Sequence, residues 1–305
     1  MRISFVRSLM IWMLTFILFL SGCGSSDKAS AEPPTYSPAQ VLVPEAPLTE
    51  TLGFSPLLLD ISNITQGYLT AISDSKDEKM NVQLSDQDNI VYSYSIAPGE
   101  SAVIPFSSGS GTYQICCYQQ IDDTQYAALF ADTLEVQLDN EFLPFLYPNQ
   151  YVNFSPGCEA SETALSIVPD DATDIEALQS IYAYVTQTLT YDSELAQNVA
   201  AGYLPDLDQV LRSKKGICFD YAALTTAMLR SRDIPCKLQI GYAGTIKHAW
   251  INVYIRSKGW VDKAIEFSGD SWSRMDPTFD SNNEDKETIQ QYIRDDENYI
   301  VQFTR

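Results

Sequence analysis

The sequence is poor in histidine and in positive charge. Its 305 residues include one histidine, His248, and 19 Lys and Arg against 40 Asp and Glu, for a formal net charge of −21. One histidine cannot build a histidine-rich metal site, so we expect no metal requirement and no cofactor. The negative charge repels nucleic acid, and the sequence has no basic patch, Gly-rich phosphate loop or heptad array. We therefore expect no nucleic-acid partner.

Residues 1–22 are typical of a lipoprotein signal peptide. Arg2 and Arg7 make the n-region positive, and residues 9–20 form an apolar run without a charged residue that is short for a bilayer span. Leu20-Ser21-Gly22-Cys23 follows and resembles the lipobox of bacterial lipoproteins. The resemblance implies cleavage before Cys23, lipid attachment to Cys23 and an extracytoplasmic location on the cell membrane. The alternative is an ordinary signal peptide with an incidental Cys23.

Residues 23–51 are predicted to be a disordered tether, because Ser, Ala and Pro dominate and apolar periodicity is absent. Residues 52–140 are predicted to form a small all-β sandwich of the immunoglobulin-like kind, with strands near 57–59, 80–84, 90–94 and 133–138. In the stretch 111–118, alternation places Tyr113, Ile115 and Cys117 on one face and Cys116 on the other. Nothing in this region indicates catalysis.

Residues 141–305 are predicted to form an α+β domain. Thr173 and Glu176 have the spacing of a capping box, and apolar residues then recur every three or four positions up to Leu189. A short helix is expected over 206–212, and a longer one begins near Cys218 and stops before Pro235. Strands are expected over 236–242 and 248–255.

Cys218 is the candidate nucleophile. Gly216 permits a tight turn just before it, and the first turn of a helix stabilises a thiolate through unpaired N–H groups and the helix dipole. Lys214 and Lys215 add positive charge nearby. Without Cys23, five cysteines remain, so at least one thiol has no partner within the monomer. The alternative is a buried structural cysteine.

His248 and Asp276 are the candidate partners of Cys218. His248 begins a predicted strand and lies on the face opposite Ala249 and Ile251. It is the one side chain in the sequence that titrates unaided near neutral pH. Asp276 precedes Pro277, and a carboxylate bonded to an imidazole nitrogen fixes its tautomer. Taken singly, a lone histidine is more often structural, and Asp-Pro is a common turn element.

Together, the stretches 216–221, 248–250 and 272–278 closely resemble the transglutaminase-like family, relatives of the papain-like thiol proteases. The resemblance covers roughly residue 170 to the C-terminus and implies a Cys218-His248-Asp276 triad for nucleophilic acyl transfer. It also suggests an upstream aromatic residue, Tyr191, as an oxyanion donor, although a core tyrosine is an equal alternative. The interval from His248 to Asp276 is longer than in the family, with 261–271 apparently inserted, so Asp262 competes for the orienting role.

The sequence thus predicts a surface-anchored cysteine acyl-transfer enzyme, a protease or amidase or a transglutaminase, that acts on peptide or protein substrates. Whether water or an amine accepts the acyl group depends on access to the cleft and stays open here, as does the oligomeric state. The alternative is a noncatalytic binding or structural lipoprotein that retains a transglutaminase-like fold.

Overall fold

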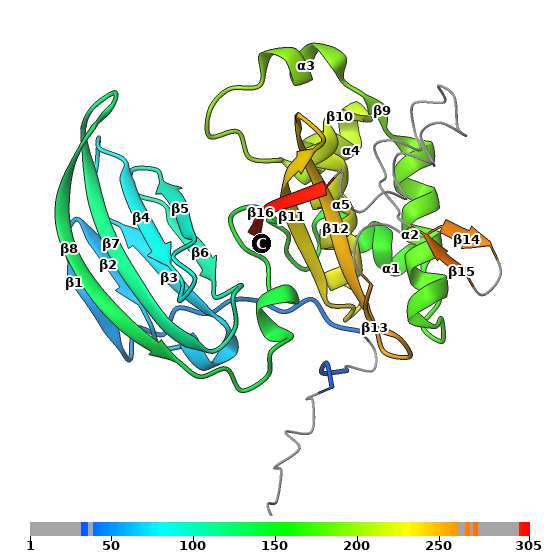
Figure 1. Ribbon diagram of the computed structural model, residues 1–305, viewed down its shortest axis with the longest axis horizontal. Helices are drawn as coiled ribbons and strands as arrows, with labels where there is room; N and C mark the ends of the chain where they lie inside the picture. The colour runs from blue at the N-terminus through cyan, green and yellow to red at the C-terminus, as the bar shows by residue number, and fades with distance from the viewer. Residues whose placement is uncertain (1–31, 36–38, 262–265, 269–270, 274–298) are drawn as a thin grey trace, which may run out of the picture. The chain divides into compact units, whose positions relative to one another are not determined.

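A computed structural model describes residues 32–35, 39–261, 266–268, 271–273 and 299–305. Two four-stranded antiparallel sheets follow the N-terminal segment, with strand orders β1-β2-β3-β6 and β5-β4-β7-β8 (Figure 1). The first sheet consists of β1 Thr51–Phe54, β2 Leu57–Asp60, β3 Tyr68–Ser73 and β6 Ser101–Pro105. The second consists of β4 Met80–Ser85, β5 Val91–Ile96, β7 Gly111–Asp122 and β8 Gln125–Val136.

Side chains from both sheets share one core, which confirms the all-β region expected from the sequence. Leu59 and Leu69 from the first sheet pack in the same cluster as Val82 and Ile115 from the second. The inward face of β7 follows the predicted alternation, since Tyr113, Ile115 and Cys117 are buried while Cys116 is half-buried. Strand β5 lies at one edge of its sheet and alternates in the same way between exposed and buried positions.

Part of the segment expected to be a tether contacts this region. The backbone N–H of Glu45 donates to the hydroxyl of Tyr68, and that of Leu48 donates to the carboxylate of Asp60. Burial raises the pKa of Asp60, but its bonds to Ser62 and to Leu48 outweigh that effect, so its pKa lies below the ordinary value. The charged carboxylate is therefore suited to hold Leu48 against β2.

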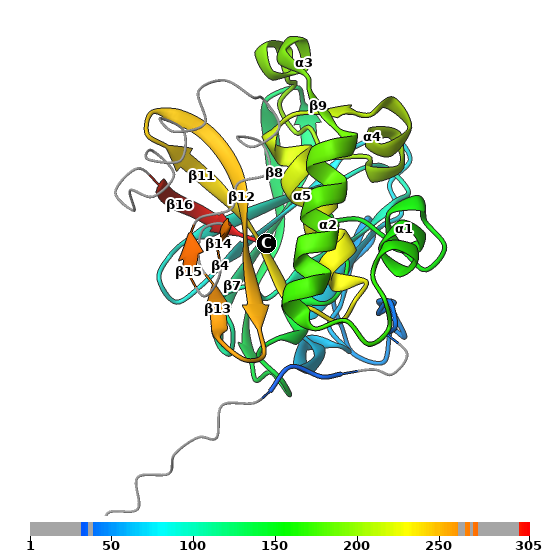
Figure 2. The same cartoon turned by 90° about the vertical axis from the view of Figure 1, so that its right-hand side faces the viewer.

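The C-terminal part is α+β, as the sequence predicts. An antiparallel sheet of order β13-β12-β11-β16 carries helices on one side (Figures 1 and 2). Its strands are β11 Cys236–Ala243, β12 Ile246–Ile255, β13 Gly259–Val261 and β16 Tyr299–Thr304, and a separate hairpin pairs β14 Glu266–Ser268 with β15 Ser271–Ser273. The helices are α1 Glu159–Ile167, α2 Asp174–Thr188, α3 Ser193–Asn198, α4 Leu207–Ser213 and α5 Cys218–Arg230.

Helix α5 is the centre of this part. It packs against α1, α2, β11 and β12, and every residue from Asp220 to Arg230 is buried. Arg230, at its end, donates hydrogen bonds to the carbonyls of Tyr147, Cys236 and Arg305. Burial lowers the pKa of Arg230 to about 10, which still leaves the guanidinium charged at neutral pH. The helix is therefore fixed at its C-terminal end, far from Cys218.

The helix boundaries test the local sequence signals. The capping box at α2 is confirmed, because the Thr173 hydroxyl accepts from the Glu176 N–H while the Glu176 carboxylate accepts from the Thr173 N–H. Asp206 caps α4 through the N–H of Gln209. Helix α1 lies before Thr173, in a stretch for which the sequence analysis predicted no helix. This helix buries small residues, Ala160, Ser161 and Ala164, so no large apolar stripe marks it.

Candidate active site

Cys218 is the first residue of α5. Lys214 ends α4 in the left-handed conformation (φ 55°), and the next two residues form β10 Lys215–Gly216, which pairs in parallel with β9 Thr190–Tyr191. Gly216 is paired with Tyr191, so the candidate nucleophile and the candidate oxyanion donor come from adjacent chain segments. The first N–H groups of a helix have no acceptor within the helix, which leaves them available to an anion beside Cys218.

Gly216 is required by the way α5 begins. The Asp220 carboxylate folds back and accepts a 2.7 Å hydrogen bond from the backbone N–H of Ile217. A Cβ at position 216 would lie 2.6 Å from the Cβ of Asp220 and 3.1 Å from its Oδ2. Because real Cβ atoms do not approach so closely, glycine is needed for this turn. The sequence reasoning attributed Gly216 to a tight turn without identifying this neighbour.

Asp220 is also bonded to the loop that follows α3. The Tyr203 hydroxyl donates a 2.7 Å hydrogen bond to the other carboxylate oxygen of Asp220, which is fully buried. Burial raises the pKa of Asp220; the bonds from Ile217 and Tyr203 lower it, and the nearby charge of Asp192 adds to the rise. Burial and the bond to Asp220 raise the pKa of Tyr203, so its hydroxyl stays protonated and can donate. Sequence reasoning missed this pair.

His248 lies in β12 opposite Gly241 of β11 and is 6% exposed. Its ring stacks at 6.3 Å and 22° on Trp250 and lies 6.4 Å from the ring of Tyr299 in β16. Tyr299 covers the face of β12 that carries His248 and Trp250, with its ring 5.2 Å from that of Trp250. The rings of Trp250 and Tyr299 therefore lie together beside the His248 imidazole and contribute to its burial.

The close approach of β16 depends on Gly241. A Cβ at this position would lie 1.9 Å from the carbonyl oxygen of Ile300, in β16, and 3.0 Å from the Trp250 ring. The pairing of β11 with β16 shifts register between Ile240 and Gly241, which is where this contact occurs. Glycine therefore brings Tyr299 close to the ring of His248.

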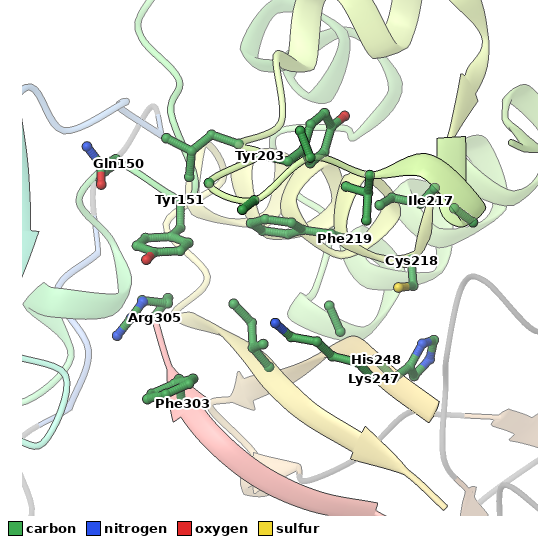
Figure 3. A pocket seen from close by; sticks show the side chains of 18 of the residues that line it. Gln150, Tyr151, Tyr203, Ile217, Cys218, Phe219, Lys247, His248, Phe303 and Arg305 are labelled. Atoms are coloured by element: carbon green, nitrogen blue, oxygen red, sulfur yellow. The ribbon is translucent and has the colours of Figure 1, made fainter. Parts of the chain in front are cut away.

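Cys218 and His248 line the same pocket, a cavity of about 1070 Å³. Figure 3 shows the Cys218 sulfur and the His248 imidazole on facing sides of this space, one from α5 and the other from β12. Tyr191 also lines the pocket. Cys23, Asp262 and Asp276 lie outside the described residues. The structure thus brings together three of the residues that the sequence singles out, Cys218, His248 and Tyr191.

The other cysteines have different surroundings. Cys117 and Cys236 are fully buried, and burial raises the pKa of each thiol to about 12. Cys158 is half-buried at the start of α1, with its sulfur 3.3 Å from the Ser161 hydroxyl. Within the described part of the chain, no group of three or more His, Cys, Asp and Glu side chains is arranged to hold a metal ion.

Comparison with protein families identifies the C-terminal part. Residues 161–277 match the model of the transglutaminase-like superfamily, so this segment is a transglutaminase-like domain. It contains Cys218, His248 and Asp276 in the order that the sequence analysis expected. A comparison with curated proteins by sequence found no significant match.

Solved structures similar to this chain include a proposed cysteine protease from Cytophaga hutchinsonii, with 16% identity over 75% of this chain and 79% of that one (TM-score 0.35). A red sea bream transglutaminase is 13% identical over 71% of this chain and 48% of its own (TM-score 0.29). A proposed protease from Parabacteroides distasonis is 11% identical over 68% and 62%, respectively (TM-score 0.31). Such distant likeness assigns no activity.

Proposed function

We propose that the protein is a cysteine-nucleophile acyl-transfer enzyme that acts on peptide or carboxamide bonds, as a protease or amidase or as a transglutaminase. The observation that supports this most is the shared pocket of Cys218 and His248 within the transglutaminase-like segment. Taken alone, Cys218 could be a structural cysteine and His248 a structural histidine, so the proposal depends on the two residues together. A thiol at a helix N-terminus is activated when an imidazole in the same pocket comes within hydrogen-bond reach of it.

The reaction follows from these positions. The Cys218 thiolate attacks the carbonyl carbon of the substrate, and a tetrahedral oxyanion forms. The bond to the leaving amine then breaks, His248 gives the amine its proton, and a thioester to Cys218 remains. Water or a second amine attacks the thioester, with His248 accepting its proton, and the thiolate is regenerated. Hydrolysis and transfer share every protein group and differ only in this acceptor.

The oxyanion needs donors in fixed positions. The backbone N–H of Cys218 belongs to the first turn of α5 and has no acceptor within the helix. We assign the second donor to Tyr191, which lines the pocket and is held beside Gly216 by the β9–β10 pairing. The orienting carboxylate in this proposal is Asp276, because it belongs to the 272–278 stretch that resembles the family.

Selective alkylation tests the proposed nucleophile. Brief treatment of the full chain with substoichiometric iodoacetamide, followed by peptide mapping, should modify Cys218 before the other thiols. Cys158 is the matched reference, because it is also half-buried and lies at a helix N-terminus, as the N-cap residue of α1. His248→Asn should slow the labelling of Cys218 and leave that of Cys158 unchanged. Equal rates at the two cysteines would refute an activated Cys218 and favour a noncatalytic binding role.

We also propose that the enzyme works outside the cytoplasm, held to the membrane by lipid on Cys23. The support is the positive n-region, the apolar run and the Leu-Ser-Gly-Cys box in the sequence. Fractionation of cells that express Cys23→Ser should find the protein released from the membrane fraction. Retention of this variant in the membrane would show that something other than Cys23 anchors it.

A further inference from the structure

The pocket beside Cys218 has a charge opposite to that of the chain. The sequence carries 40 acidic residues against 19 basic ones, yet the described residues that line the pocket include no Asp and no Glu. They do include Lys247 and Arg305, in addition to His248. Three carboxylates are next in sequence to lining residues. Asp192 is bonded to the N–H of Leu195, Asp220 is bonded to Ile217 and Tyr203, and Glu194 is exposed and does not line the pocket.

Lys247 is the cation nearest to the proposed chemistry along the chain. It precedes His248 in β12, and its side chain is exposed. Figure 3 shows its ammonium group extending into the pocket, between Cys218 and His248 on one side and Arg305 on the other. Among the described residues it has no ion-pair partner, so its charge is available to a ligand.

Arg305 adds a second positive charge at the other end of the pocket. Its guanidinium lies 4.3 Å from the ring centre of Tyr151, 4.6 Å from that of Tyr92 and 5.3 Å from that of Phe303. The side chain is 2% exposed, and its Nε and Nη1 are buried with no hydrogen-bond acceptor in the described part of the chain. Aromatic faces hold this cation in place but do not neutralise it.

From this charge pattern we infer that the pocket takes a peptide acyl donor that carries a carboxylate, and that Lys247 pairs with that carboxylate. The inference rests on the proposed function, because it names the substrate class of the same site. Arg305 raises the positive potential along the pocket without contacting the ligand. The net charge of the chain repels an acidic peptide at long range, but salt screens that repulsion beyond about 8 Å at physiological ionic strength. Contact with Lys247 acts within that distance.

Binding is tested apart from chemistry with full-length protein carrying Cys218→Ser. The probes are two acetylated tripeptide amides, Ala-Glu-Ala and Ala-Gln-Ala, whose affinities are compared by ligand-observed NMR. We expect the Glu peptide to bind roughly two- to five-fold more tightly, the range of a partly exposed ion pair. Lys247→Gln should abolish this preference, Lys247→Arg should keep it, and added salt should weaken it.

Lys79→Gln is the matched control, because it changes the net charge equally at an exposed position outside the pocket. Equal affinity for the two peptides would overturn the inference, as would loss of the preference in Lys79→Gln. A second readout uses protein with an intact Cys218 and measures the ratio of its alkylation rate by iodoacetate to its rate by iodoacetamide. This ratio should be higher in the wild type than in Lys247→Gln. Slow alkylation of Cys218 by both reagents would count against the proposed function, whereas a rate ratio unchanged by Lys247→Gln would count against the acidic substrate.

Discussion

The hydroxyl of Tyr203 donates a 2.7 Å hydrogen bond to the carboxylate of Asp220, two residues after Cys218. Tyr203 and its neighbours in the loop after α3 line the pocket, whereas Asp220 is fully buried behind it. One carboxylate therefore holds both the start of α5, through the N–H of Ile217, and one wall of the pocket. The position of Cys218, the proposed nucleophile, and that of the pocket wall depend on the same side chain.

Tyr203→Phe removes one of the two donors to this buried carboxylate. We expect the free energy of unfolding to fall by about 1–3 kcal/mol, because a buried charged acceptor loses a hydrogen bond. The pKa of Asp220 should rise further, since the bond from Tyr203 lowers it. Denaturant unfolding measures the loss. Tyr126→Phe, at an exposed tyrosine of β8, is the control, and equal stabilities of the two variants would contradict the prediction.

Asp220→Asn should change how stability depends on pH. Because the folded pKa of Asp220 is raised above 3.8, its proton stabilises the folded state below the unfolded pKa. That contribution is lost as the pH rises through the folded pKa. Asn cannot ionise, so the free energy of unfolding of the variant should rise relative to that of the wild type between about pH 4 and pH 7. Unfolding curves at both pH values measure the difference in free energy of unfolding between variant and wild type, with exposed Asp88→Asn as control. The same difference at about pH 4 and pH 7 would contradict the prediction.

The buried thiols should be inert in the folded protein. The pKa values of Cys117 and Cys236 are raised to about 12 by burial, so both remain protonated near pH 8. Mapped alkylation should leave these two cysteines unmodified under native conditions and label them after unfolding in guanidinium chloride. Labelling of Cys236 in the native state at the rate of Cys158 would show that the core around α5 opens readily.

Asp276→Asn should alter the reactivity of Cys218, whereas Asp262→Asn should leave it unchanged. The orienting carboxylate fixes the tautomer of His248, so its loss should cut turnover by orders of magnitude while the fold is preserved. The measurement is the rate of Cys218 alkylation across roughly pH 5 to 9, where a Cys-His pair changes its charge state. The opposite pattern would assign the orienting role to Asp262.

The structural features that could be predicted from the sequence are those whose interacting residues lie close together along the chain. The capping box at Thr173 spans four residues, and the alternation of Tyr113, Ile115 and Cys117 is visible within one strand. The expectation that Cys218 and His248 lie together came from a family resemblance, because no local pattern connects residues thirty positions apart. In the structure, both residues line the same pocket.

The remaining features depend on contacts between distant segments. Tyr203 and Asp220 are 17 positions apart, and only the N3 position of Asp220 in its helix gives a local signal, that of a capping acid. Trp250 is covered by Tyr299, which joins the sheet from far along the chain. Helix α1 lacks both a side-chain cap and a stripe of large apolar residues, so neither usual helix signal was present.

The contacts of Arg305 have a consequence for heat stability. Tyr92 and Tyr94 belong to β5 of the N-terminal sheets, whereas Arg305 directly follows β16 of the C-terminal sheet. The backbone of Arg305 exchanges two hydrogen bonds with Leu238 of β11. A guanidinium that lies over two rings of β5 while its backbone pairs with β11 thus couples the two hydrophobic cores. A ligand that occupies the pocket should therefore raise the melting temperature of both cores together, as a single calorimetric transition.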